Sequence, residues 1–108
     1  MKPAILRPQA QRDQQGEARY YRSEGGPRVA VKVAHATNAA LDQIELDPGI
    51  GSPALGDRLG IRGLRTWRVA KFPLLWCYFE RGVRLDVVRL LGERQHITSI
   101  LGDEFASN

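Results

Sequence analysis

The spacing of apolar residues in the first half of the chain predicts two helices. In the second of them, small or apolar side chains recur at steps of three and four: Ala30, Val33, Ala34, Thr37, Leu41 and Ile44. This period places them on one helical face. Residues 9–24 have a thinner apolar face but no proline, and Pro8 suits a first helical turn. The turn Gly25-Gly26-Pro27 between the two segments predicts a helical hairpin over about residues 8–46.

The pattern in the second half of the chain is typical of strands. Side chains alternate from Leu64 to Phe72, which places Arg65 and Lys71 on one face and Arg68 on the other. The run Leu74–Phe79 is apolar on both faces, as in a central strand. A hairpin turn at residues 80–82 then leads to a third strand, residues 83–91.

Shorter elements complete the expected order. Residues 4–6 form a short apolar strand candidate, and residues 94–101 a short terminal helix. Residues 48–63 are rich in glycine and proline and are expected to be an irregular connector. Residues 103–108 should fray at the chain end.

The order of elements predicts an α+β fold. A helical hairpin followed by consecutive hairpin-linked strands favours an antiparallel sheet, made of the short first strand and a three-stranded meander over residues 64–91. The hairpin and the sheet each need the other's apolar surface, so we expect them to pack together. At 108 residues, the chain is expected to form one domain, residues 1–108.

The thiol and histidine content limits the chemistry. One cysteine, Cys77, excludes an internal disulfide framework and favours a reducing, cytoplasmic location. Cys77 lies in the most apolar strand, where a buried inert thiol is the better interpretation. His35 and His96 have no ligand spacing with it, so no metal is expected. The sequence has no glycine-rich phosphate motif, membrane span or leader, so no cofactor and no membrane partner are expected.

The charge pattern favours an acidic partner. The chain carries a formal net charge of +4, and its basic residues are mostly arginine, which binds carboxylates and phosphates through two parallel hydrogen bonds. The window 58–71 contains five basic residues and no acid. A nucleic acid or an acidic protein segment is therefore expected as partner, although a solvated face of this size can also carry such charge.

A cationic surface with one imidazole is the main candidate for chemistry. It consists of Arg65, Arg68, Lys71, Arg89, Arg94 and His96. Such a surface could cleave RNA without a metal, with His96 as acid and base and arginines stabilising the transition state. It could equally bind a phosphate backbone or an acidic peptide without chemistry. The strand alternation prevents all six from converging on one point, unless the strand twists or a bulge intervenes.

The order of four motifs resembles the ParE/RelE superfamily of toxins from type II toxin–antitoxin systems, the ParE branch most. The motifs are Ala10-x-x-Asp13 leading to Tyr20-Tyr21; Asp47-Pro48-Gly49-Ile50-Gly51-Ser52-Pro53; Gly63-Leu64-Arg65-x-Trp67-x-Val69-x-x-Phe72-Pro73; and Val87-Val88-Arg89-Leu90-Leu91-Gly92-Glu93-Arg94-Gln95-His96-Ile97. The first helix departs from the family pattern at Gln14 and Glu17, where apolar residues are usual. His96 stands where the ParE pattern usually has Asp.

The resemblance implies a toxin that inhibits DNA gyrase, with no active site of its own. Target-binding residues would be Arg65, Arg68, Lys71, Arg94 and His96. The alternative is a RelE-like endonuclease that cuts mRNA in the ribosome, with Arg89, Arg94 and His96 as catalytic residues. Against it, Leu75 and Ile100 occupy the places where that branch has its arginine and its tyrosine or histidine. A third hypothesis is an inactive remnant that binds only its antitoxin.

The resemblance also implies an antitoxin partner. The expected form is a ParD-like ribbon-helix-helix protein whose acidic tail folds onto the toxin's helical hairpin and sheet edge. The antitoxin-binding candidates are Tyr20, Tyr21, Val33, Arg65 and Trp67. Operator DNA would be bound only through the antitoxin.

Overall fold

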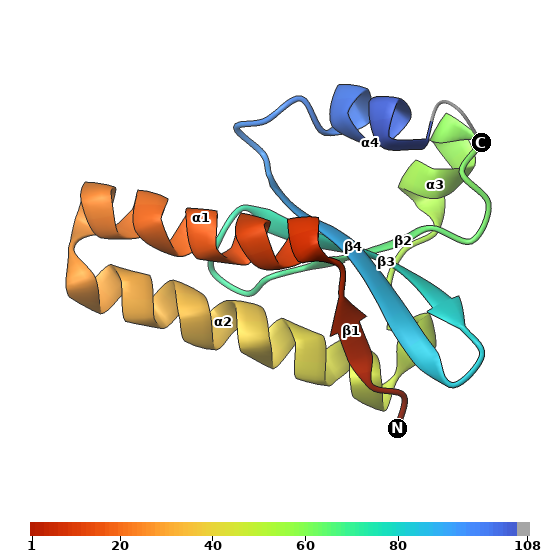
Figure 1. Ribbon diagram of the computed structural model, residues 1–108, viewed down its shortest axis with the longest axis horizontal. Helices are drawn as coiled ribbons and strands as arrows, with labels where there is room; N and C mark the ends of the chain where they lie inside the picture. The colour runs from red at the N-terminus through yellow and green to blue at the C-terminus, as the bar shows by residue number, and fades with distance from the viewer. Residues whose placement is uncertain (106–108) are drawn as a thin grey trace.

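The computed structural model describes residues 1–105, and its helices and strands follow the predicted order (Figure 1). The elements are β1 (Ala4–Leu6), α1 (Pro8–Gly25), α2 (Pro27–Leu46), the 3-10 turn η1 (Pro48–Ile50), α3 (Ala54–Leu59), β2 (Arg65–Arg68), β3 (Leu74–Arg81), β4 (Arg84–Gly92) and α4 (Ile97–Phe105). The helical hairpin, the meander and the α+β fold class are confirmed.

The sheet is mixed, because its first strand runs parallel to its neighbour. The strand order is β1-β4-β3-β2, and the three later strands pair antiparallel as predicted. β1 pairs with β4 in parallel, with Ala4 beside Leu85 and Leu6 beside Val87. The prediction of a wholly antiparallel sheet was therefore wrong for β1. The alternation of side chains does not reveal strand direction; here α1, α2, β2 and β3 lie between the two paired strands along the chain.

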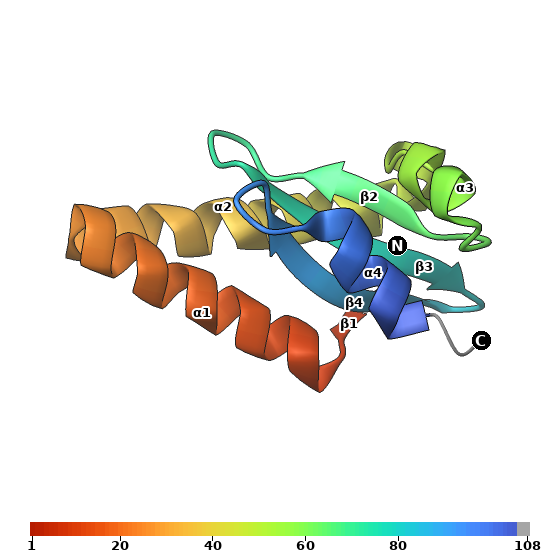
Figure 2. The same cartoon turned by 90° about the horizontal axis from the view of Figure 1, so that it is seen from above.

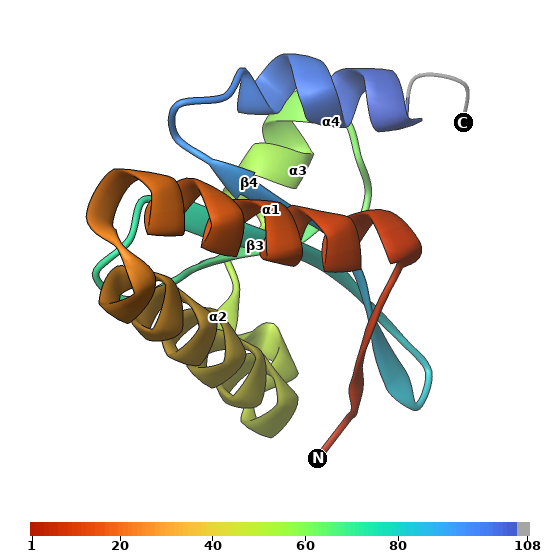
Figure 3. The same cartoon turned by 60° about the vertical axis from the view of Figure 1, so that its left-hand side comes forward.

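Helices cover both faces of the sheet. Figure 3 shows α2 on one side of β3 and β4 and the short helices α3 and α4 on the other. On the α2 side, Trp76 is fully buried, and its Nε1 donates to the carbonyl oxygen of Thr37 at 3.0 Å. On the α3 and α4 side, Leu64, Val88 and Leu101 belong to a second buried cluster. The apolar character of β3 on both faces follows from this double cover.

Residues 48–63, expected to be irregular, contain the turn η1 and the helix α3. Leu55, Leu59 and Ile61 are partly buried against the second cluster, and this packing gives α3 a place on the sheet. Gly56 makes the approach possible, because a Cβ there would lie 2.7 Å from the carbonyl oxygen of Leu64. The propensity of so short a segment is a weak signal, and tertiary packing decides it.

Two further boundaries differ from the predictions. The second strand ends at Arg68 rather than Phe72, because the chain turns there and Lys71 adopts a left-handed φ of 71°. The terminal helix begins at Ile97 rather than at residue 94 and extends to Phe105, whose ring meets Phe79 edge-to-face at 5.6 Å. Residues 103–105 are therefore helical rather than frayed, and residues 106–108 lie outside the described part of the chain.

Asp86 connects the ends of three strands. Its carboxylate accepts hydrogen bonds from Arg7, directly after β1, at 2.9 and 3.0 Å, and from Arg81, at the end of β3, at 3.0 Å. The hydrogen bonds from Arg7 are the main reason that the pKa of Asp86 lies below its usual value. The carboxylate is therefore more stable ionised in the folded chain than in the unfolded chain.

We predict that Asp86 contributes to acid sensitivity. Because its folded pKa is below the ordinary 3.8, its contribution is complete above about pH 5 and is lost as pH falls through the folded value. The difference in unfolding free energy between the native chain and Asp86→Asn should be constant above about pH 5 and shrink below it. Urea unfolding at several pH values measures this. Glu24→Gln, at an exposed carboxylate, serves as a control for the other carboxylates. A difference for Asp86→Asn that does not vary with pH would contradict the role given to Asp86.

Candidate functional site

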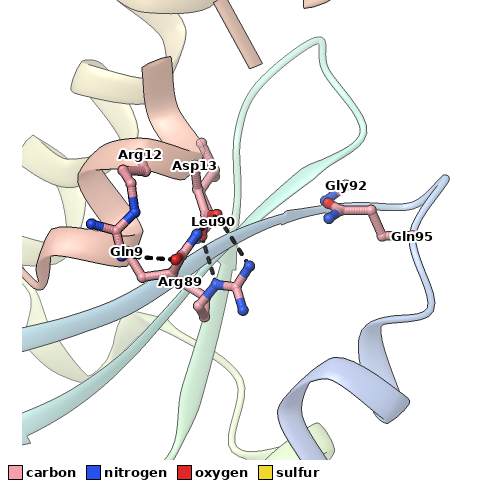
Figure 4. Close-up of polar contacts among 7 residues, drawn as sticks. All are labelled: Gln9, Arg12, Asp13, Arg89, Leu90, Gly92 and Gln95. Atoms are coloured by element: carbon pink, nitrogen blue, oxygen red, sulfur yellow. Dashed lines mark hydrogen bonds and ion pairs between the residues drawn. The ribbon is translucent and has the colours of Figure 1, made fainter. Parts of the chain in front are cut away.

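An ion pair joins α1 to the middle of β4. Asp13 accepts hydrogen bonds from Nε and Nη2 of Arg89, at 2.7 and 3.1 Å, and from the main-chain N–H of Leu90 at 3.0 Å (Figure 4). The side chains of Asp13 and Arg89 are only 9% and 14% exposed. The hydrogen bond to Asp13 is the main cause of the raised pKa of Arg89. Both charges are thus satisfied inside the molecule.

The local structure of β4 explains this geometry. Tyr78 pairs with Val87 and Cys77 with Arg89, so Val88 is an extra residue, a β-bulge, on β4. Bulges redirect the side chains beside them. β1 pairs with β4 only as far as Val87, and no other strand in residues 1–105 pairs with that edge of β4 beyond it. Asp13 accepts the Leu90 N–H there. The carboxylate of Asp13 on α1 therefore accepts a main-chain hydrogen bond that a neighbouring strand would otherwise accept.

A second ion pair lies one helical turn further along α1. Glu17 accepts hydrogen bonds from both terminal nitrogens of Arg94, at 2.9 and 3.1 Å. The Glu17 side chain is 6% exposed, and the Arg94 guanidinium also stacks on Tyr20, 3.7 Å from the ring centroid. The hydrogen bond to Glu17 is the main cause of the raised pKa of Arg94. Nearby, Gln14 donates to Thr37 and Asn38 of α2.

These contacts explain the departures of α1 from the family pattern. At Gln14 and Glu17, hydrogen bonds to α2 and to Arg94 take the place of the usual apolar packing. They also affect the candidate nuclease residues. Arg89 and Arg94 each hold a carboxylate of α1, so neither offers a free guanidinium beside the exposed His96.

The other three target-binding candidates have separate environments. Arg65 donates to the carbonyl oxygens of Gly51 and Gly49, at 2.6 and 3.3 Å, and so holds the segment after α2 against β2. Arg68 pairs with Glu93 at 2.7 Å on an exposed surface. Lys71 is exposed at the turn between β2 and β3. The structure therefore does not gather them into one cationic site.

Two neighbouring grooves lie beside β2. The first, about 860 Å³, has Trp67, Phe72 and Leu75 among its lining residues and follows β2. The second, about 670 Å³, lies between α2 and the β2–β3 turn. Ala70, Lys71 and Phe72 line both, so we call them together the α2–β2 groove.

The lining of the α2–β2 groove combines apolar and basic side chains. Its cationic and imidazole groups are Lys32, His35, Arg68 and Lys71, of which Arg68 is paired with Glu93, and no Asp or Glu among residues 1–105 lines it. Sequence reasoning did not identify Lys32, His35 or Phe72 as groove residues. No local signal could have done so, because the groove forms only where the β2–β3 turn meets α2.

The outer edge of β2 is partly covered. Ser52 and Thr66 exchange two main-chain hydrogen bonds, of 2.8 and 3.0 Å, in an isolated bridge. Main-chain groups that point outward recur at every second residue, so Arg68 is the next such position. Among residues 1–105, no strand pairs with β2 on that side. The free edge therefore opens into the α2–β2 groove.

The antitoxin-binding candidates divide into accessible and inaccessible residues. Trp67 lines the groove, and its Nε1 donates to Gln43 of α2 at 2.8 Å. Tyr21 packs edge-to-face on the groove residue Phe72, with centroids 5.2 Å apart. Tyr20 is 38% exposed beneath Arg94, whereas Val33 is fully buried in the core. The Val33 side chain is therefore out of reach of a partner in this structure.

The remaining candidates for chemistry lie as follows. Cys77 is buried, and this burial raises the pKa of its thiol to about 12, so the thiolate is scarce at neutral pH. Within residues 1–105, no three His, Cys, Asp or Glu side chains gather in a way that could bind a metal ion. None of the described helices is both long and apolar enough to cross a membrane.

Comparisons with known proteins identify the fold. No protein-family model matches the sequence, and neither does any curated protein. Among solved structures, a chain of the "Chromosomal ParDE TA system from P. aeruginosa" matches with a TM-score of 0.72. The match covers 85% of this chain and 96% of that chain, at 18% sequence identity. The ParE-like fold predicted from the motifs is thus confirmed.

We predict that removing one partner of the Glu17–Arg94 pair destabilises the fold. Glu17→Gln keeps the shape of the side chain but leaves Arg94 without its charge partner. Since Arg94 is partly exposed, the unfolding free energy should fall by only about 1–2 kcal/mol. Glu24→Gln, on the exposed side of the same helix, should change it by less than about 0.5 kcal/mol. Chemical denaturation measures both, and equal effects of the two variants would contradict the prediction.

Proposed function

We propose that this chain is the toxin of a type II toxin–antitoxin system, that it inhibits DNA gyrase, and that it acts in the cytoplasm. The observation that carries the proposal is the fold shared with a chain of a ParDE TA system over 85% of this chain. The four motifs that resemble the ParE branch support the same conclusion from the sequence.

The ion pairs of α1 favour gyrase inhibition over RNA cleavage. A metal-free nuclease needs cations that are free to stabilise the charge of the transition state. Here Arg89 binds Asp13 and Arg94 binds Glu17. Leu75 and Ile100 have aliphatic side chains, which supply neither an acid nor a base. Leu75 lines the α2–β2 groove, and Ile100 packs against the second core. A binding protein without its own active site agrees better with this arrangement.

The partner we propose is a ParD-like ribbon-helix-helix antitoxin. Its acidic, amphipathic tail would occupy the α2–β2 groove, because an apolar floor with basic rims and no acids complements such a segment. An extended part of the tail could add to the free edge of β2 at Arg68. Sequence-specific binding of operator DNA would belong to the antitoxin.

The first test is a gyrase supercoiling assay. Purified protein incubated with gyrase, ATP and plasmid should inhibit supercoiling and accumulate cleaved DNA in proportion to its dose. Protein inactivated by heat is the control. Absence of both effects at every dose would remove the gyrase proposal. If mRNA cuts appear on induction and vanish in His96→Ala and Arg94→Ala, the endonuclease alternative replaces it. Unimpaired growth on overexpression would favour the inactive remnant.

The second test addresses the groove. With the product of a short neighbouring reading frame as antitoxin, Lys71→Glu should weaken the complex by about tenfold, since it places a negative charge on the groove rim. Arg58→Glu, exposed on α3 outside the groove, makes the same charge change and should alter affinity less than about twofold. Isothermal titration calorimetry measures both. Equal losses in the two variants would show that the antitoxin binds elsewhere.

A further inference from the structure

The joined ends of α1 and α2 project beyond the sheet (Figures 1 and 2). We call residues 18–36 the hairpin tip; its inner side packs on the core at Val33, and Lys32 and His35 also line the α2–β2 groove. A close junction holds its two helices together: a Cβ at Gly25 would lie 2.8 Å from Cγ2 of Val29. The tip is thus a firmly joined pair of helices, with its outer sides open to solvent.

The hairpin tip carries a local excess of exposed positive charge. It contains four cations, Arg19, Arg22, Arg28 and Lys32, and one acid, Glu24, in a chain of formal net charge +4. All four cations are exposed, and the ion pairs found in residues 1–105 involve none of them. By contrast, Arg89, Arg94 and Arg68 further along the chain are each paired with a carboxylate.

Helix stability accounts for only part of this charge. Arg22 lies in the last turn of α1, where a cation is favourable. Arg28 and Lys32 lie in the first two turns of α2, where cations oppose the helix dipole, and that helix has no acid in its first turn. These two charges therefore weaken α2 slightly, so fold stability does not explain them.

The placement of the four cations matches an extended anion. Arg19 and Arg22 are three residues apart on one side of α1, and Arg28 and Lys32 are four apart on one side of α2. Such spacing spreads positive charge along two helices rather than around one pocket. We propose that the hairpin tip binds the phosphate backbone of a nucleic-acid duplex, without reading its sequence.

A duplex agrees better with the tip than a single strand does. Proteins that hold single strands stack bases on free aromatic rings. The tip has two aromatic rings, and both are occupied: Arg94 stacks on Tyr20, and Tyr21 packs on Phe72. Three of the four cations are arginines, whose planar guanidinium suits phosphate oxygens. The binding mode we propose is therefore contact with the phosphate backbone alone, and it requires no antitoxin.

This inference is independent of the proposed function, because duplex binding is measured without gyrase or antitoxin. The experiment uses fluorescence anisotropy with a labelled duplex of about 20 base pairs, as DNA and as RNA, over a series of salt concentrations. The tip variant is Arg19→Gln/Arg22→Gln/Arg28→Gln. The control variant, Arg58→Gln/Arg62→Gln/Arg84→Gln, removes the same charge from exposed sites outside the tip.

The expected result is a loss confined to the tip variant. Its Kd should rise by at least about tenfold, and the slope of log K against log salt should become shallower by about 2.7, or 0.9 for each lost phosphate contact. The control variant should change Kd less than about threefold. Equal affinity for the DNA and RNA duplexes would show that the tip recognises the phosphates that both share. A higher affinity for one of them would show which kind of duplex the tip binds.

Three results would overturn the proposal. One is no duplex binding at low salt, and another is equal losses in the two variants. The third is displacement of the duplex by poly-glutamate, together with a loss of affinity for poly-glutamate in Val31→Ser. Val31 is 54% exposed on the tip, so an apolar contact there would indicate an acidic protein partner. A circular-dichroism melt of each variant checks that it is folded.

Discussion

The pairing of α1 carboxylates with arginines of β4 and the following segment determines how the two halves of the molecule meet. β1 is only three residues long, so most of the edge of β4 would be open without another partner. Asp13 covers that edge through Arg89 and the Leu90 N–H, and Glu17 fixes Arg94 one turn later. Buried ion pairs of this kind contribute little net stability but penalise other registers, because a shift of the helix would leave a buried charge alone.

These ion pairs also decide which of the chain's cations remain available to a partner. The second half of the chain is the more basic in sequence, yet Arg68, Arg89 and Arg94 are paired there, and Arg65 is bound to carbonyl oxygens. In the described part of the chain, the cations without an ion pair include those of the hairpin tip and Lys71 in the α2–β2 groove. Two basic surfaces result, which share Lys32: the α2–β2 groove, with an apolar floor suited to a peptide, and the hairpin tip, whose cations are spread along two helices as suits a backbone of phosphates.

The sequence alone was sufficient for the features that depend on local periodicity. The three- and four-residue steps from Ala30 to Ile44 predicted α2, and the doubly apolar run from Leu74 predicted the central strand. It did not predict the direction of β1, the helix α3 or the end of β2, because packing between distant segments decides them. The pairs Asp13–Arg89 and Glu17–Arg94 join residues more than 70 positions apart, and no pattern in either segment identifies the partner. The groove was missed for the same reason.

The short bridge between Ser52 and Thr66 has a consequence for association of identical chains. A long free edge strand invites pairing with a second copy, which leads to aggregation. β2 has four residues, and the bridge already occupies the outward main-chain groups of Thr66, so little of the edge remains. An approaching copy would gain too few main-chain hydrogen bonds to remain bound. A segment that also fills the adjacent groove, as we propose for the antitoxin tail, would gain both contacts, so the edge would favour such a strand over self-addition.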